Sequence, residues 1–133
     1  MIEVNNLTRF KIDEKSFTRL SEKVLMGEKK ERTELSVSLV IPLEIKKFNK
    51  KYRKIDRETD VLSFAYNDFG EILICPKVVK ENAEKYGESF KRELKKVLIH
   101  GLLHIFGYDH GKNDSEAKKM EKKTNYYLNL DIK

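Results

Sequence analysis

Residues 89–107 read SFKRELKKVLIHGLLHIFG and predict a helix that changes character along its length. In the first half, apolar residues such as Phe90 and Leu94 recur at helical spacing, with lysine and arginine on the opposite side. From Val97 to Phe106, apolar residues lie on every side of the helix. Gly107 then ends the helix, because glycine enters a left-handed turn without strain. The second half of this helix is therefore predicted to be buried.

The segments around this helix predict a small sheet. Strand patterns fall at residues 2–10, 35–41, 61–66 and 71–75. Helical patterns cover 14–26, 42–52, 76–86 and the segment that follows Asn113, which pairs with Glu116 as a capping box. The turn-rich residues 67–70 should join the last two strands as a hairpin. This order predicts an α+β fold with a small mixed four-stranded sheet and about five helices, in a single domain over residues 1–133.

Composition narrows the class of protein. The 133 residues include 28 Lys+Arg against 22 Asp+Glu, which gives a net charge of +6 and a pI near 9.3. Such a charge favours polyanions such as nucleic acid, although lysine richness also marks a merely solvated surface. The single cysteine, Cys75, cannot form an internal disulfide, and it is expected to be a packed small residue. No apolar run is long enough to cross a membrane, and residues 1–10 lack a secretory signal, so a cytoplasmic protein is expected.

All three histidines of the chain fall within residues 100–110, HGLLHIFGYDH. His100 and His104 are four residues apart and therefore share a helix face. A turn at Gly107 would allow His110 to approach them. Isolated histidines near an apolar face are commonly satisfied core residues, but three unsatisfied imidazoles in one apolar patch would each cost about 1–3 kcal/mol. The spacing favours a shared metal ion.

Three imidazoles without a thiolate leave a fourth position open on zinc, and this is typical of a catalytic site. The same spacing occurs in the metzincin proteases, which place a glutamate directly after the first histidine as general base. Here that residue is Gly101, which instead opens space or lets a neighbouring element pack closely against the helix. A peptidase is therefore the second choice.

The stretch HGLLHIFGYDH resembles the signature of the YbeY family of bacterial rRNA maturation factors, which are metal-dependent single-strand endoribonucleases. Residues 49–66, NKKYRKIDRETDVLSFAY, and 70–79, GEILICPKVV, resemble two further blocks of that family in the same order. The sequence has Glu58 and Ala65 where the family usually has proline, and Glu71 where it usually has aspartate. These are turn or strand-edge positions, so loop shape is affected rather than chemistry.

The resemblance implies that His100, His104 and His110 hold a metal ion and that Arg53 is functionally important, and we expect His104 and Arg53 to be the catalytic residues. One zinc ion per chain is expected, while nickel and copper stay open because three imidazoles suit all three metals and availability decides between them. A planar guanidinium suits a phosphodiester because it can bind two oxygens at once. The structural alternative for Arg53 is a surface ion pair with Asp56 or Asp60. Asp109 either orients a ligand histidine or caps the turn before His110.

The resemblance also implies a function, which is maturation of the 3′ end of small-subunit rRNA and ribosome quality control. The expected partners are single-stranded or ribosomal RNA and the ribosome or its small subunit, with no membrane. Lys50, Lys51 and Lys54 are candidate contacts for an RNA backbone. Two alternatives stay open, a metallopeptidase-like hydrolase and a non-catalytic ribosome-assembly factor with a structural metal.

Overall fold

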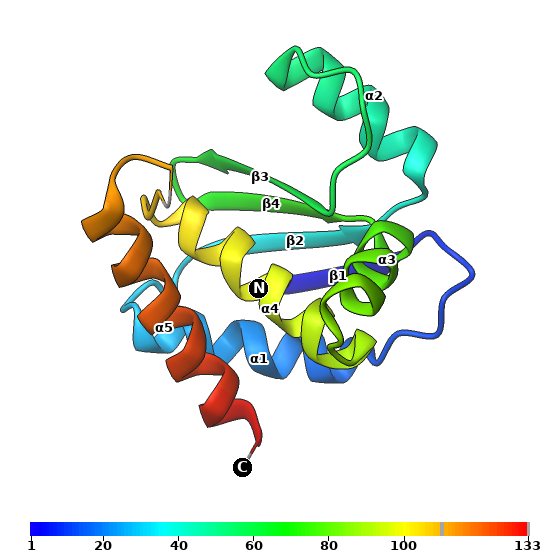
Figure 1. The fold of residues 1–133 in the computed structure, drawn as a ribbon. Coiled ribbons are helices and arrows are strands. Elements are labelled where there is room, and N and C mark those ends of the chain that lie inside the picture. The colour runs from blue at the N-terminus through cyan, green and yellow to red at the C-terminus, as the bar shows by residue number, and fades with distance from the viewer. Residues whose placement is uncertain (110, 133) are drawn as a thin grey trace.

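The computed structural model describes residues 1–109 and 111–132 of the chain. Within these residues the chain forms four strands and five helices (Figure 1). In chain order they are β1 (Ile2–Asn6), α1 (Glu14–Gly27), β2 (Glu34–Leu39), α2 (Pro42–Arg53), β3 (Val61–Tyr66), β4 (Phe69–Ile74), α3 (Pro76–Tyr86), α4 (Phe90–Ile105) and α5 (Asp114–Ile132). The predicted α+β class and the predicted order of elements are confirmed.

The four strands form one mixed sheet in the order β1-β2-β4-β3. β1 and β4 run parallel to β2, which places Val37 opposite both Val4 and Ile72. β3 is antiparallel to β4 and forms an edge of the sheet, with Ser63 opposite Ile72. Parallel neighbours need a crossover connection, and α1 supplies it between β1 and β2. The predicted hairpin of β3 and β4 is present.

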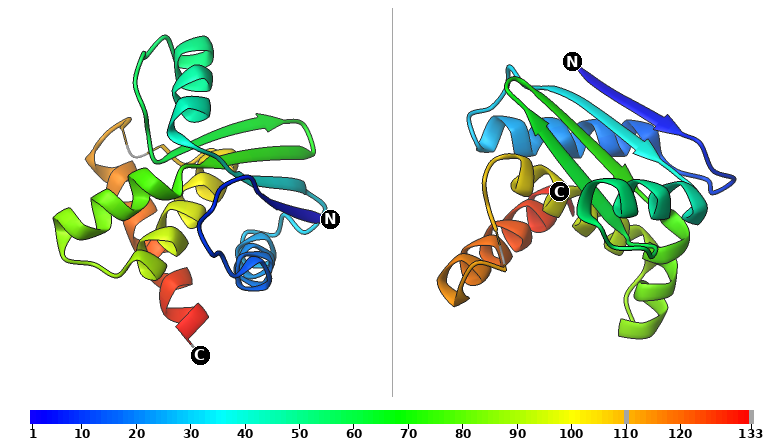
Figure 2. Two further views of the ribbon diagram at one scale, coloured as in Figure 1. Left: turned by 90° about the vertical axis from the view of Figure 1, so that its right-hand side faces the viewer. Right: turned by 90° about the horizontal axis from the view of Figure 1, so that it is seen from above.

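Helices cover the two faces of the sheet unequally. α1 and α4 lie against one face, with α5 packed behind them, whereas α2 lies on the opposite face (Figure 2). The larger core, between the sheet and α1 and α4, includes the strand residues Leu35, Val37, Leu39, Ile72 and Ile74. The smaller core, under α2, consists of the buried residues Val40, Ile45, Leu62, Leu73 and Cys75. Cys75 is thus a packed core residue, as predicted.

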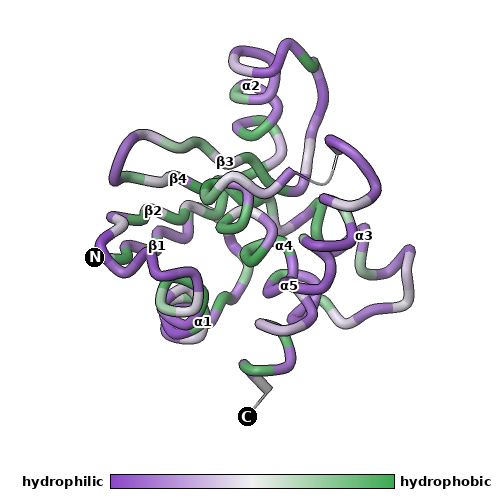
Figure 3. The backbone as a smooth tube through the Cα atoms, turned by 90° about the vertical axis from the view of Figure 1, so that its left-hand side faces the viewer, coloured by the Kyte–Doolittle hydropathy of each residue, from purple (hydrophilic) through white to green (hydrophobic). Residues whose placement is uncertain are grey.

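The helix α4 packs closely on β4 through two glycines. A Cβ added to Gly101 would lie 3.1 Å from Cγ2 of Ile72, and one added to Gly70 would lie 2.8 Å from Cδ1 of Ile105. Hydrophobic residues are concentrated where α4 passes beside the strands, while many residues of α5 and of the outer turns are hydrophilic (Figure 3). The second half of α4 is buried as predicted, and Gly101 serves the close packing anticipated for it.

Three predicted strand boundaries were wrong for local reasons. The strand predicted at residues 35–41 ends at Leu39, because Pro42 begins α2. The first strand ends at Asn6 rather than near residue 10, because the Asn6 side chain accepts hydrogen bonds from the N–H and the hydroxyl of Thr8 and bends the chain. β4 begins at Phe69, because Phe69 and Gly70 already pair with β3. The turn is therefore only Asn67 and Asp68, and Asn67 adopts φ 36°.

Candidate functional site

The first two predicted metal ligands lie on α4. Ser89 caps this helix by accepting the N–H of Arg92 (3.1 Å), and the helix then continues without a break through both histidines. His100 and His104 stand one helical turn apart and both are half-buried. Buried apolar residues flank them on the sheet side of the helix. Two partly buried imidazoles on the same face of a helix are a pair of nitrogen donors that suits zinc.

The third predicted ligand, His110, lies outside the described residues. Within residues 1–109 and 111–132 there is no group of three or more His, Cys, Asp or Glu side chains that could hold a metal ion. His100 and His104 are neutral nitrogen donors one helical turn apart, and this part of the predicted donor set fits zinc. The three-histidine site itself stays a prediction.

The chain reverses immediately after α4. Gly107 adopts φ 97°, a conformation that glycine takes without strain, and donates its N–H to the carbonyl of His104 (3.0 Å). The N–H of Tyr108 then donates to the carbonyl of Leu103 (3.0 Å). Asp109 is exposed, and its Oδ1 accepts the N–H of Gly111 (2.9 Å). Both roles predicted for Asp109, capping the turn before His110 and orienting a ligand histidine, stay predictions.

Tyr108 takes part in a polar cluster that sequence reasoning missed. Glu28, which caps the end of α1, accepts hydrogen bonds from the hydroxyl of Tyr108 (2.7 Å), from the hydroxyl of Tyr127 and from Nζ of Lys123 (3.2 Å). We call these four residues the Glu28 cluster. Burial raises the pKa of the Glu28 carboxyl, but the three donors outweigh burial and hold the pKa below its usual value. Burial and the bond to Glu28 raise the pKa of Tyr108 to about 12.

The lowered pKa of Glu28 predicts an acid-dependent contribution to stability. A carboxyl whose pKa is lower in the folded state stabilises the fold fully above its unfolded value, here 4.5, and loses that effect as pH falls through the folded pKa. We therefore expect Glu28→Gln to lower the free energy of unfolding by about 1–3 kcal/mol at pH 7, since hydrogen bonds to charged groups are the stronger ones. In urea unfolding, the gap between the two proteins should shrink below pH 4.5. A gap that stayed constant down to pH 3 would contradict the prediction.

Arg53 lies elsewhere, at the end of α2. Its side chain is exposed and lines a polar hollow of about 270 Å³ between the α2–β3 loop and α3. The other residues that line the hollow are Asn49, Ile55, Arg57, Glu58, Thr59, Asp60, Val78 and Asn82. Of the two carboxylates considered as its partners, Asp56 instead pairs with Lys50 (3.9 Å), and Asp60 accepts a hydrogen bond from Thr59 (3.4 Å). The ion pair predicted as the structural alternative for Arg53 is therefore not formed with either of these carboxylates among the described contacts.

The three candidate RNA-contacting lysines surround Arg53. Lys50 makes the exposed ion pair with Asp56, and Nζ of Lys51 lies 5.2 Å from the ring centroid of Tyr52. Lys54 adopts φ 61° and ends α2 by donating its N–H to the carbonyl of Lys50 (3.2 Å). All three side chains are exposed. Tyr52, which sequence reasoning did not select, has an aromatic ring beside Lys51, and the residue is 53% exposed.

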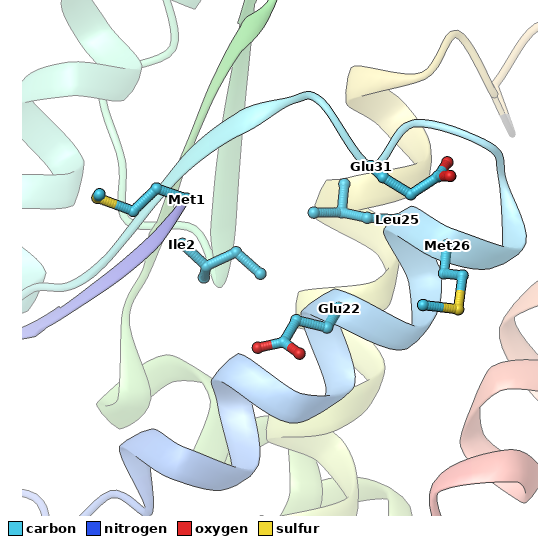
Figure 4. Close-up of a pocket in the computed structure, with 6 residues that line it drawn as sticks. All are labelled: Met1, Ile2, Glu22, Leu25, Met26 and Glu31. Atoms are coloured by element: carbon cyan, nitrogen blue, oxygen red, sulfur yellow. The ribbon is translucent and has the colours of Figure 1, made fainter.

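The helix that carries Arg53 and the helix that carries the two histidines lie on opposite faces of the sheet, and both contact β3 (Figure 2). α2 packs on β3 from one face, and α4 packs on β3 from the other. β3 is an edge strand, so no further strand of the sheet lies beyond it to separate α2 from α4. A different hollow, of about 290 Å³, lies between β1 and α1 and is lined by Met1, Ile2, Glu22, Leu25, Met26 and Glu31 (Figure 4). It contains none of the predicted site residues.

Among the described helices, none combines the length and apolar character needed to cross a membrane. The chain matches the family model described as Endoribonuclease YbeY over residues 3–130. It is 45% identical over 113 residues to Endoribonuclease YbeY of Thermotoga neapolitana, an alignment that covers 82% of this chain and 76% of the relative. It is 41% identical over 132 residues to Endoribonuclease YbeY of Staphylococcus epidermidis, with 85% and 84% covered.

A solved structure shows the same fold. The solution structure of a Thermotoga maritima protein superposes with a TM-score of 0.69 at 37% sequence identity, and the match covers 96% of this chain and 87% of that one. The match to the family model includes residues of all nine elements, and it covers the histidine-bearing α4 and the arginine-bearing α2 completely. On these grounds the chain belongs to the YbeY family of endoribonucleases.

Proposed function

We propose that this endoribonuclease depends on zinc and cleaves single-stranded RNA, with ribosomal RNA in the cytoplasm as its substrate. The observation that carries the proposal is the pair of half-buried histidines one turn apart on α4, followed directly by a chain reversal at Gly107. In the proposed reaction the protein matures the 3′ end of small-subunit rRNA and takes part in ribosome quality control. The ribosome or its small subunit is accordingly the proposed partner.

The proposed zinc site consists of His100, His104 and His110. When bound there, a divalent ion supplies positive charge that stabilises a phosphodiester in the transition state. The protein's part is to hold two imidazoles on a rigid helix whose other sides are fixed by the core. Asp109, which accepts the N–H of Gly111, is proposed to cap the turn before His110 or to orient one of the ligand histidines.

Arg53 is proposed to bind the scissile phosphate through two guanidinium nitrogens and to offset the charge that builds on its oxygens. The exposed Tyr52 ring and the neighbouring lysines offer stacking and backbone contacts to one flexible strand. Bases of a single strand are free to stack, whereas those of a duplex are not, so this surface favours unpaired RNA.

The test is a side-by-side cleavage assay with zinc-loaded protein and with chelator-treated protein. The substrates are single-stranded RNA, duplex RNA, a precursor of small-subunit rRNA and casein. We expect cleavage of the single strand and of the precursor 3′ end, loss of cleavage on chelation, and recovery on adding zinc. Casein cleavage without RNA cleavage would support the metallopeptidase alternative instead. An RNA cleavage rate that is unchanged by the chelator would refute the zinc dependence.

Electrostatic contacts from the lysines around Arg53 should make RNA binding depend on salt. Replacing Lys50, Lys51 and Lys54 by glutamine is expected to weaken RNA binding at low salt and to reduce the slope of log affinity against log salt by about 2, at roughly 0.7 per contact. The control replaces three other exposed lysines, Lys15 on α1 with Lys118 and Lys122 on α5, and changes the net charge equally. Equal slopes for the two triple variants, measured by fluorescence anisotropy, would exclude this surface as the RNA contact.

A further inference from the structure

The Glu28 cluster joins three segments of the chain at one carboxylate. Glu28 is 8% exposed and lies directly after α1. Its donors Tyr127 and Lys123 belong to α5, while Tyr108 belongs to the turn that follows α4. A buried carboxylate with three donors is a fixed anchor, because moving any donor away would leave a charge poorly satisfied.

The two tyrosines of the cluster have the same chemistry and different positions. Tyr127 is 1% exposed in the second half of α5, and Gly27 leaves room for its ring, since a Cβ at position 27 would lie 2.8 Å from Cε1. Its hydroxyl therefore ties α5 to α1 inside the core. Tyr108 lies between the histidines of α4 and position 110, so its hydroxyl ties that connecting segment to α1.

Tyr108 is held at further points. Its N–H donates to the carbonyl of Leu103 on α4 (3.0 Å), and Nζ of Lys119 on α5 lies 5.5 Å from its ring centroid. Together with the bond to Glu28, these contacts fix both the backbone and the side chain of Tyr108 against three helices. A residue held in this way constrains the start of the segment that follows it.

We propose that Glu28 is a positioning residue for the zinc site and that it acts by holding the Tyr108 hydroxyl. This inference rests on the proposed zinc-dependent function. A chain already fixed at Tyr108 loses less conformational freedom when residue 110 binds the ion, and preorganisation of this kind raises affinity. Partners that orient metal ligands typically change metal affinity by about 10- to 100-fold.

The test compares Tyr108→Phe with Tyr127→Phe in the full chain. Each substitution removes one hydroxyl that donates to the same carboxylate, and each keeps the aromatic ring. Zinc affinity is measured by competition with a chromophoric chelator, and the unfolding temperature is measured on the zinc-free proteins. We expect both variants to unfold at lower temperature, but only Tyr108→Phe to bind zinc about 10- to 100-fold more weakly.

A second readout does not need the metal. In the zinc-free protein, the backbone amide of residue 108 should exchange with solvent faster in Tyr108→Phe than in the wild type, and it should be unchanged in Tyr127→Phe. Excess zinc should restore RNA cleavage by Tyr108→Phe, because affinity and not chemistry is affected. Equal zinc affinities for the two variants, in a wild type that binds zinc, would overturn the positioning role alone. A wild type that binds no zinc would overturn the proposed zinc dependence together with it.

Discussion

Replacing His104 by alanine is expected to abolish zinc binding and to lower RNA cleavage by about 10³-fold or more, with the fold retained. Charge stabilisation by a bound divalent ion amounts to several kcal/mol, and each 1.36 kcal/mol corresponds to a tenfold change in rate. His104 is only half-buried near the end of α4, so its loss leaves the core intact. Metal analysis of the purified protein and initial cleavage rates give the two measurements.

Metal analysis of further single alanine variants shows whether the loss of zinc is specific to the predicted ligands. His100→Ala and His110→Ala should lose zinc as His104→Ala does, whereas Lys96→Ala, an exposed change one turn before His100, should keep it. Unchanged zinc content in His110→Ala would refute the three-histidine site. A His104→Ala protein that loses zinc, stays folded and still supports ribosome maturation would favour the assembly-factor alternative.

Removing the Arg53 guanidinium is expected to have the second largest effect on catalysis. Arg53→Ala should keep zinc and fold but cleave RNA about 10²- to 10³-fold more slowly, as for the loss of one group that binds transition-state charge. Arg53→Lys should recover only part of the rate, because an ammonium lacks the two-nitrogen fork. Single-turnover cleavage at saturating protein separates this effect from weaker binding.

The matched control for Arg53 is Arg57, which lines the same polar hollow and is also exposed. Arg57→Ala carries the same charge change and should slow cleavage only a few-fold. If both variants lost activity equally, the general positive charge of the hollow would explain the effect. If neither lost activity, Arg53 would have no role in the reaction.

Local sequence patterns predicted most of the helices and strands, because the features that define these elements span only a few consecutive residues. The alternation of residues 35–41 predicted a strand with one buried face, and Leu35, Val37 and Leu39 do enter the larger core. The capping box predicted the start of α5, where Asn113 accepts the N–H of Glu116 (2.8 Å). Each of these features depends on residues a few positions apart, which a sequence displays directly.

The features that the sequence did not predict depend on contacts between segments that are far apart in the chain. Nothing near Glu28 in sequence indicates that its carboxylate will meet Tyr108, which lies 80 residues further on. The placement of α2 and α4 on opposite faces of the sheet depends on the strand order, and periodicity does not determine that order. The spacing of His100 and His104 predicted a shared helix face, but not that this helix would pack on an edge strand.

The contact between Gly101 and Ile72 restricts which substitutions this helix can accept, and in which order. The glutamate that metzincins carry at the position of Gly101 would place its Cβ 3.1 Å from Ile72 and its carboxylate toward the larger core. Gly101→Glu alone should therefore destabilise the protein strongly, while a smaller residue at position 72 should relieve part of that cost. The two positions are therefore epistatic. For this fold to acquire the glutamate of a peptidase at position 101 of α4, a smaller residue would first have to replace Ile72 on β4.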